Sequence, residues 1–393
     1  MTSEELKQMD DSYVMHTYGR FPIAIEHGEG ATVFDYEGNK YIDFTSGIGV
    51  NCLGYGNQGW ADAIYTQAKK LGHMSNLYYT EPCAQLAKTL CMRTGMSKVF
   101  FGNSGAEANE GMIKLARKYS YDKYGEGRAT IITLQDSFHG RTITTLNATG
   151  QDVFHKYFFP FTEGFRHAKP NDMDDLKAQM GDDVCAVMLE LIQGEGGVNP
   201  LDPEYVKQVR EFCTENDLLM LVDEVQTGVG RTGSLFCFQS YDLKPDVVSF
   251  AKGIAGGLPM GGIMAAEPYQ DVLGPGTHAS TFGGNPIAAA AGNYIQSVMD
   301  DKFLSDVQAK GDYMRSQILG NGSPFVEAVQ GKGLMIGIRL SGLRNSDVCN
   351  SLNSRGLLTL TAGNNVLRLL PPLAISTEEI DEGLDILLGL IGN

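Results

Sequence analysis

Lys252 is the residue of this sequence whose surroundings most favour chemistry. It follows a run of apolar and β-branched residues, 247–251, that predicts a buried strand, and it precedes a segment rich in glycine. Lysines normally keep their amines in water, so a lysine in this position either extends to the surface or works as an amine. Partial burial lowers the pKa of an amine, and the neutral form is the one that attacks an aldehyde.

An acid upstream of this lysine provides a partner for such chemistry. Residues 218–222 are hydrophobic and are followed by Asp223, which predicts a central strand whose carboxyl end opens on a crevice. Pyridoxal phosphate, an aldehyde on a pyridine ring, needs a lysine that holds its aldehyde and an acid that keeps its ring nitrogen protonated. Asp223 and Lys252 supply both, each at the end of a predicted strand, which argues against a solvated acid and a surface lysine.

A site for a phosphate group is predicted at residues 102–107, Gly-Asn-Ser-Gly-Ala-Glu. This stretch follows a predicted strand and begins a predicted helix, so free backbone N–H groups and the positive end of the helix dipole converge there. Taken alone, an ordinary helix N-cap explains the pattern better than a phosphate site does.

A second glycine-rich run, residues 228–233, matches the spacing of a dinucleotide-binding loop. The residues that follow it, Ser-Leu-Phe-Cys-Phe-Gln, have no amphipathic helical pattern, whereas the dinucleotide loop requires a strand, a turn and a helix in succession. We therefore expect no nicotinamide cofactor.

An aromatic residue and an arginine lie close together in residues 138–142, Phe-His-Gly-Arg-Thr. An aromatic face can stack on a pyridine ring, and an arginine binds a carboxylate through two hydrogen bonds. The alternative is a core phenylalanine beside a surface arginine. His139 by itself is weak evidence for any role, and none of the seven histidines has the spacing of metal ligands, so we expect no metal site.

Length and composition are those of a globular enzyme. A chain of 393 residues is longer than one hydrophobic core usually supports, which predicts one large and one smaller domain. The net charge of −16 argues against nucleic acid or an anionic membrane as the main partner. Seven cysteines without a Cys-x-x-Cys spacing favour a reducing compartment, and no apolar run is long enough to span a bilayer. We therefore expect a cytoplasmic protein.

The elements that must position these residues alternate along the middle of the chain. Strands are predicted at 98–102, 129–134, 184–192, 218–225 and 247–251, and helices at 60–71, 81–92, 107–124 and 203–216. This alternation predicts a mainly parallel sheet covered on both faces. Residues before 45 are expected to form an arm of short strands, 31–36 and 40–44, without a long helix. A helix at 287–319, a strand at 333–340 and a helix at 377–390 predict a second α+β domain that packs with the arm.

Two stretches together, Leu-Val-Asp-Glu-Val-Gln-Thr-Gly at 221–228 and Ser-Phe-Ala-Lys-Gly at 249–253, resemble the class III, or ω-amino acid, aminotransferases, which use pyridoxal phosphate. The resemblance covers nearly the whole chain. It implies the type I fold of PLP-dependent aminotransferases, an α/β fold with a large, mainly parallel domain and a smaller α+β domain. The implied parts are an N-terminal arm (1–50), a large PLP-binding domain (51–285) and a C-terminal small domain (286–393).

The resemblance also implies roles for individual residues. Lys252 and Asp223 are expected to be catalytic. The residues expected to bind the cofactor are Ser104, Gly105, Ala106, Phe138, Asp223, Val225, Gln226, Lys252 and Thr281. Those expected to bind the substrate are Tyr18, Arg141, Glu195, Ser280 and Arg368.

More detailed placements follow from the same resemblance. Phe138 and Val225 are expected on the two faces of the ring, and Gln226 at its hydroxyl. The segment 280–285 is similar to one that crosses a dimer interface, which implies a homodimer in which Thr281 reaches the phosphate of the neighbouring subunit.

Three placements concern the substrate. Arg141 is expected to bind a substrate carboxylate. Glu195 is expected to pair with Arg368 and to release it when glutamate binds. Leu191 replaces a proline that relatives often carry, which could alter how Glu195 is presented.

Two stretches favour the branch of the family that acts on acetylornithine. Ile48, in Ser-Gly-Ile-Gly, takes the place of a tyrosine frequent in ornithine-using relatives, and residues 73–82 fit the same branch. The implied reaction, a step of arginine biosynthesis, transfers the side-chain amine of N2-acetyl-L-ornithine to 2-oxoglutarate and gives N-acetyl-L-glutamate 5-semialdehyde and glutamate. The alternatives are ornithine, succinylornithine or 4-aminobutyrate as substrate, or a catalytically silent protein of this fold that acts as a regulator.

Overall fold

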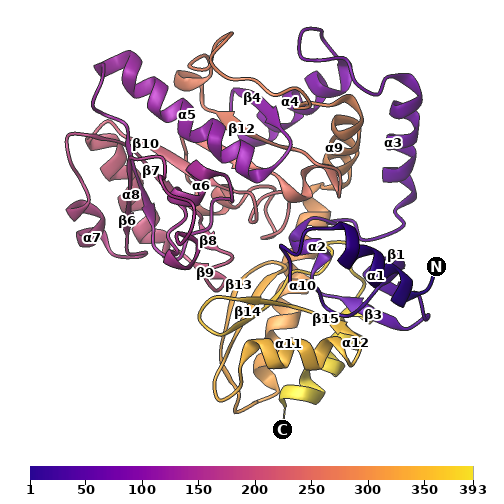
Figure 1. Ribbon diagram of the computed structural model, residues 1–393. Coiled ribbons are helices and arrows are strands. Elements are labelled where there is room, and N and C mark those ends of the chain that lie inside the picture. Colours follow the sequence, from indigo (N-terminus) through magenta and orange to yellow (C-terminus); the bar gives the residue numbers. More distant parts are fainter. Residues whose placement is uncertain (393) are drawn as a thin grey trace.

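The computed structural model describes residues 1–392 and has two main parts, one above the other in Figure 1. The upper, larger part is built on a seven-stranded sheet in the order β4–β12–β11–β10–β7–β5–β6. β12 is antiparallel to both of its neighbours, whereas β11, β10, β7, β5 and β6 pair in parallel. The strands are β4 (Lys98–Gly102), β5 (Thr130–Leu134), β6 (Phe165–Ala168), β7 (Val184–Leu189), β10 (Leu219–Asp223), β11 (Val247–Phe250) and β12 (Gly261–Ala265). The predicted mainly parallel sheet is confirmed.

Helices cover both faces of this sheet. In β10, Leu219 and Leu221 pack into a core shared with α5, whereas Met220 and Val222 face a second core that includes residues of α8. A strand buried on both faces reads as a continuous hydrophobic run, which is why β10 was recognisable from the sequence. The helices of this part are α3 (Gln58–Lys70), α4 (Glu81–Thr94), α5 (Gly105–Tyr124), α6 (Ile143–Ala148), α7 (Met173–Ala178), α8 (Pro203–Glu215) and α9 (Pro286–Val298).

The smaller part combines both ends of the chain. Its antiparallel sheet has the order β13–β14–β17–β16, and a second sheet, β1–β2–β3–β15, joins the N-terminal arm to the C-terminal region through the parallel pair β3 and β15. The predicted packing of arm against tail is confirmed by this pairing. The strands are β1 (Ile25–Glu29), β2 (Thr32–Asp35), β3 (Lys40–Asp43), β13 (Val326–Lys332), β14 (Met335–Leu340), β15 (Leu357–Leu358), β16 (Leu360–Ala362) and β17 (Val366–Leu369).

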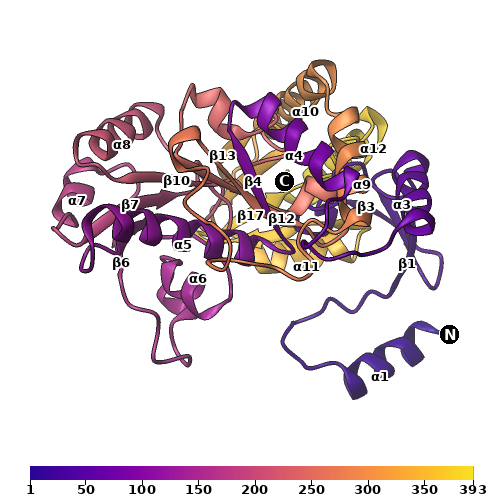
Figure 2. The same ribbon diagram turned by 90° about the horizontal axis from the view of Figure 1, so that it is seen from above.

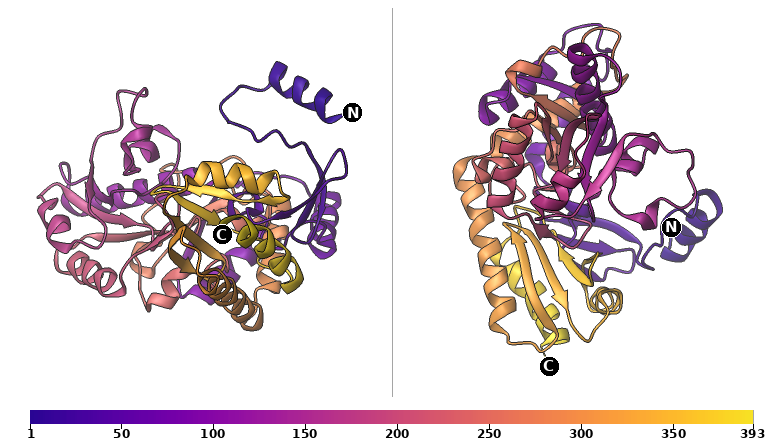
Figure 3. Two further views of the ribbon diagram at one scale, coloured as in Figure 1. Left: turned by 90° about the horizontal axis from the view of Figure 1, so that it is seen from below. Right: turned by 90° about the vertical axis from the view of Figure 1, so that its left-hand side faces the viewer.

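Three further helices complete the smaller part. They are α10 (Asp301–Gly320), α11 (Asn345–Asn353) and α12 (Thr377–Ile391), and α10 runs along one side of the molecule (Figure 3). Short elements lie between the main ones: α2 (Ser46–Gly49), β8 (Ile192–Gln193), β9 (Asn199–Pro200) and the 3-10 helices η1 (Asp152–Phe154), η2 (Cys237–Tyr241), η3 (Lys252–Ala255) and η4 (Glu267–Tyr269). The domain limits 1–50, 51–285 and 286–393 stay a prediction.

The structure differs from the sequence prediction in the arm and at 287–319, and it contains the helices α6, α7 and α11, which the sequence did not predict. The arm begins with an 11-residue helix, α1 (Ser3–Tyr13), which is capped by Thr2 and stands apart from the rest of the chain in Figure 2. The long helix predicted at 287–319 is two helices, because Asp300 accepts a hydrogen bond from the backbone N–H of Phe303 and starts α10 as an N-cap.

The glycine-rich run 228–233 connects the two parts of the molecule. Arg231 is buried in it, and its guanidinium donates to the carbonyls of Leu334 at 2.9 Å and Pro371 at 2.6 Å, and to Ser46 Oγ at 3.3 Å. Burial lowers the pKa of Arg231 to about 10. A turn and the 3-10 helix η2 follow the run, so it lacks the strand–turn–helix arrangement of a dinucleotide loop.

We expect Arg231→Ala to lower the free energy of unfolding by about 2 to 4 kcal/mol, because it leaves buried carbonyls without a donor. Urea denaturation measures the change. Arg355→Ala is the control, since Arg355 is exposed, and should change stability by less than about 0.5 kcal/mol. If Arg231→Ala lowers the free energy of unfolding by less than about 1 kcal/mol, water replaces the guanidinium, and the contact between the two parts of the molecule does not depend on Arg231.

Candidate active site

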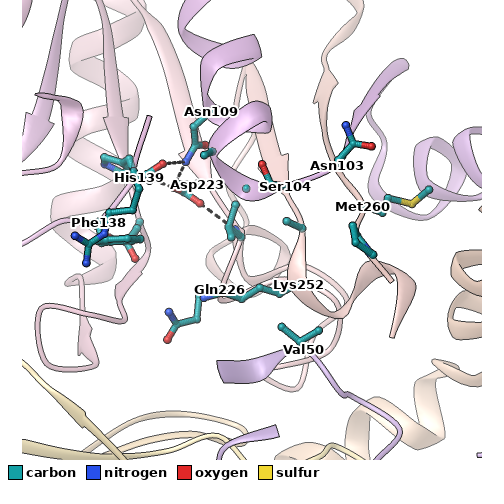
Figure 4. Close-up of a pocket in the computed structure, with 18 of the residues that line it drawn as sticks. Val50, Asn103, Ser104, Asn109, Phe138, His139, Asp223, Gln226, Lys252 and Met260 are labelled. Atoms are coloured by element: carbon teal, nitrogen blue, oxygen red, sulfur yellow. Dashed lines mark hydrogen bonds and ion pairs between the residues drawn. The ribbon is translucent and has the colours of Figure 1, made fainter. Parts of the chain in front are cut away.

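A cavity of about 410 Å³ opens beside the carboxyl ends of the parallel strands, where an α/β sheet usually binds its ligand (Figure 4). β10 and the turns that follow β4, β5, β7 and β11 supply most of its wall. The predicted site residues that line it are Ser104, Gly105, Ala106, Phe138, Arg141, Asp223, Val225, Gln226 and Lys252. The structure therefore brings together residues from four separate stretches of the sequence, while the role of each stays a prediction.

Lys252 lies two residues after the end of β11, at the first position of η3. Its φ of 43° is in the left-handed region, which residues other than glycine seldom adopt and which is often found at functional sites. Burial lowers the pKa of Lys252 to about 8, although the nearby carboxylate of Glu195 acts in the opposite direction. A much larger share of this amine is therefore neutral near pH 8 than of a surface lysine.

Asp223, at the end of β10, is 3% exposed and is held through both of its oxygens. Asn109 Nδ2 donates to Oδ2 at 2.7 Å, and His139 Nδ1 lies 2.8 Å from the same oxygen (Figure 4). The backbone N–H of Val225 donates to Oδ1 at 2.9 Å. Such donors stabilise a buried carboxylate, which can then face a ligand cation.

Asn109, His139 and Glu190 line the cavity but were not predicted as site residues. Asn109 could have been found from its spacing, because it lies one helical turn after Gly105 on α5. Glu190 accepts hydrogen bonds from the backbone N–H groups of Phe138 at 2.9 Å and Gly194 at 3.2 Å, and burial raises its pKa to about 7. It therefore ties together the two loops that carry Phe138 and Glu195.

The start of α5 provides the predicted phosphate turn. Ser104 is the N-cap of this 20-residue helix and accepts a hydrogen bond from the N–H of Glu107 at 3.1 Å. A side chain on Gly105 would place its Cβ 2.7 Å from Val225 Cγ1, so only glycine fits against that wall. In the same turn the Ser104 hydroxyl donates to the Glu107 carboxylate at 3.1 Å. A bound phosphate would replace Glu107 as the acceptor of this hydrogen bond.

These residues fit pyridoxal phosphate. An amine of lowered pKa, a buried carboxylate, a helix N-terminus and an aromatic ring at Phe138 surround one cavity. Each matches a different group of the cofactor: its aldehyde, ring nitrogen, phosphate and ring face.

Glu195 and Arg368 form an ion pair that connects the two parts of the molecule. Arg368 Nη1 lies 2.6 Å from Glu195 Oε1 and Nη2 lies 3.2 Å from Oε2. Gln226, on the cavity wall, accepts a further bond from Arg368 at 3.1 Å. Burial raises the pKa of Glu195, but the charge and hydrogen bonds of Arg368, together with smaller contributions from Lys252 and Gln226, hold the pKa below its usual value. Leu191 in place of the family proline does not prevent this pairing.

Six residues named from the sequence do not line this cavity: Tyr18, Ile48, Glu195, Ser280, Thr281 and Arg368. Glu195 and Arg368 both contact Gln226, which is on the cavity wall. Tyr18 is 74% exposed in the arm, and Thr281 is also exposed. Ser280 lies at the edge of the site, because its Oγ accepts a bond from Asn103, a wall residue, at 3.2 Å. The contribution of Thr281 to a neighbouring subunit stays a prediction.

Among residues 1–392 there is no group of three side chains placed to hold a metal ion. Within the same residues, no helix is both long enough and apolar enough to cross a membrane.

Known proteins are similar to this chain along nearly its whole length. Acetylornithine aminotransferase of Haemophilus ducreyi is 50% identical over 98% of this chain and 98% of its own length, and that of Caldanaerobacter subterraneus is 49% identical over 96% and 97%. The solved structure of ornithine aminotransferase from Toxoplasma gondii has a TM-score of 0.95 and 31% identity, covering 99% of this chain and 94% of that one. Acetylornithine aminotransferase from Elizabethkingia anophelis has a TM-score of 0.88 and 31% identity, covering 100% and 99%.

The solved structures confirm the type I aminotransferase fold expected from the sequence. The family model of the class-III aminotransferases matches residues 13–391, a range that contains both main parts of the molecule and every residue of the cavity. The chain belongs to the class-III aminotransferases.

Proposed function

We propose that the protein uses pyridoxal phosphate to transfer the side-chain amine of N2-acetyl-L-ornithine to 2-oxoglutarate, giving N-acetyl-L-glutamate 5-semialdehyde and glutamate. The observation that carries this proposal is the pair of arginines beside Lys252. Arg141 lines the cavity without an acidic partner among residues 1–392, whereas Arg368 is paired with Glu195. The relatives that are about half identical over nearly the whole chain are named acetylornithine aminotransferases.

The protein's own residues divide the work around the cofactor. Bound pyridoxal phosphate supplies an aldehyde that condenses with amines and a ring that takes up electrons. Lys252 would hold the aldehyde of the bound cofactor and, as a general base, would move a proton at the reacting carbon of the substrate. Asp223 would keep a proton on the ring nitrogen, and the N-terminus of α5 would bind the phosphate.

The two substrates place their carboxylates differently. Acetylornithine reacts at the carbon that bears its side-chain amine, and its single carboxylate lies at the far end. Glutamate reacts at a carbon that carries a carboxylate directly, and its second carboxylate lies at the far end, one methylene closer. Arg141 serves the distal carboxylate of both, while a second cation is needed for glutamate alone. Arg368 fills that role.

The ion pair of Glu195 and Arg368 allows one cavity to serve both half-reactions. An unpaired buried arginine beside the apolar chain of acetylornithine would be unfavourable, and Glu195 neutralises it. When glutamate binds, its α-carboxylate replaces Glu195 as the partner of Arg368. The paired arrangement is the one that suits acetylornithine.

We further infer a cytoplasmic homodimer in which Thr281 reaches the phosphate of the neighbouring subunit. Phe282, next to Thr281, is 60% exposed, and this segment lies beside the cavity wall because Ser280 accepts a hydrogen bond from Asn103. All seven cysteines are free, as in a reducing compartment.

Ornithine is the second candidate substrate. The solved structure with a TM-score of 0.95 is an ornithine aminotransferase, and Ile48, which favoured acetylornithine, does not line the cavity. Succinylornithine and 4-aminobutyrate are further alternatives within the same chemistry, and a catalytically silent regulator would show no response to any amine.

Single-turnover measurements on the cofactor-loaded protein test the substrate. We expect kcat/KM for acetylornithine to exceed that for ornithine by at least about tenfold, because the free α-amine of ornithine would carry a charge into an apolar region. Lys252→Ala is the control and should remove turnover with both. A faster reaction with ornithine, succinylornithine or 4-aminobutyrate would contradict the proposal.

Arg368→Ala tests the exchange of the ion pair. Because truncating one member of a buried charge pair typically costs about 2 to 5 kcal/mol, we expect the glutamate half-reaction to slow by roughly 30-fold to several thousand-fold. The acetylornithine half-reaction should be spared, Arg141→Ala should damage both halves, and Glu195→Ala should favour the glutamate half. Equal slowing of both halves by Arg368→Ala would rule out the exchange.

A further inference from the structure

Arg141 is held in the cavity wall by aromatic rings. Its guanidinium carbon lies 4.0 Å from the centroid of the Phe154 ring and 5.4 Å from that of Phe138. The two rings meet edge to face, with centroids 6.0 Å apart and an interplanar angle of 78°. Among residues 1–392 the guanidinium has neither an ion pair nor a hydrogen bond, in contrast to Arg368, which is paired with Glu195.

Stacking on a ring restrains an arginine differently from an ion pair. A ring contacts the face of the planar guanidinium and leaves the N–H groups at its edge free for a carboxylate. An acidic partner would occupy those N–H groups and cancel the charge, so that a substrate would first have to displace it. A long side chain that is already restrained also loses less freedom when it binds.

The backbone around Phe154 is anchored to the large part of the molecule on both sides. Phe154 is the last residue of η1 and is partly buried. Before it, Gln151 Nε2 donates to the carbonyl of Ser137 at 2.9 Å, and after it, His155 Nε2 lies 2.8 Å from the carbonyl of Leu146. The segment between α6 and β6 projects from the molecule in Figure 2, but its beginning, which carries Phe154, is tied down.

We propose that Phe154 is a positioning residue that fixes the plane of Arg141 so that this arginine selects amine substrates bearing a distal carboxylate. The inference rests on the proposed function, because that function assigns the distal carboxylate to Arg141. Phe154 lies outside the 138–142 motif, and its ring adds to the specificity of the reaction without touching the reacting atoms.

The test compares two amines in half-reactions of the cofactor-loaded protein. N-acetylornithine carries the carboxylate, whereas N-acetylputrescine has the same amine, chain and acetamide without it. Phe154→Met keeps a similar volume but removes the ring. We expect it to raise KM for N-acetylornithine about 3- to 30-fold with little change in kcat, and to leave KM for N-acetylputrescine within about twofold.

Other variants separate positioning from folding. Phe154→Tyr keeps the ring and should behave as the wild type. Phe158→Met removes a ring of the same segment that packs on Tyr157 instead of an arginine, and it should change neither KM. If Phe154→Met does not fold, Phe154→Leu repeats the comparison.

The double variant with Arg141→Ala decides between the possible outcomes. If Phe154 acts through Arg141, Phe154→Met has no further effect once the arginine is gone. An equal rise in KM for both amines, or the same effect with and without Arg141, overturns the inference. If Arg141→Ala itself leaves the preference for the carboxylate-bearing amine intact, the role of Arg141 in the proposed function is wrong, and the inference falls with it.

Discussion

The buried carboxylate of Asp223 is the charge around which the cavity is arranged. A carboxylate removed from water is stable only when donors surround it, and here Asn109, His139 and the backbone of Val225 provide them. Each donor belongs to a segment that also builds the wall. Asn109 is on the helix that begins with the phosphate turn, His139 follows Phe138, and Val225 itself lines the cavity. The hydrogen bonds that compensate the charge therefore also fix the shape of the site.

Arg368 and Arg141 are restrained by different kinds of contact, and this difference matches their proposed roles in substrate binding. Arg368 has an acidic partner that can be exchanged for a substrate carboxylate, which suits a cation needed in one half-reaction only. Arg141 has aromatic partners that leave its charge and its N–H groups available, which suits a cation needed in both. Burial lowers the pKa of Lys252 to about 8, an effect that the carboxylate of Glu195 opposes and the charge of Arg368 reinforces.

Much of this arrangement could be predicted from the sequence, because the central strands are short apolar runs. Two of these runs lead to a residue that can take part in catalysis. β10 ends at Asp223 and β11 is followed by Lys252 within a residue or two, so the parallel topology alone brings both side chains to one edge of the sheet. The resemblance to a known family then connected the arginines and the phosphate turn, which lie far apart in the sequence.

Other features could not be predicted, because tertiary contacts define them. His139 and Glu190 gain their importance only when separate loops meet in the cavity wall. β12 begins with two glycines, which have a low strand propensity, so it could not be recognised as a strand from the sequence. Its antiparallel pairing in a mainly parallel sheet is a tertiary feature. Phe154 lies in a stretch rich in aromatic residues, and nothing in the sequence tells which ring faces Arg141.

The protonation of the cofactor ring tests the central role of Asp223 most directly. Nitrogen NMR of protein loaded with cofactor labelled at the ring nitrogen measures it in the wild type and in Asp223→Ala. The account predicts a protonated ring nitrogen in the wild type from neutral to mildly alkaline pH, and an unprotonated one in Asp223→Ala while borohydride still links the cofactor to Lys252. An unprotonated ring nitrogen in the wild type, or a protonated one in both proteins, would contradict it.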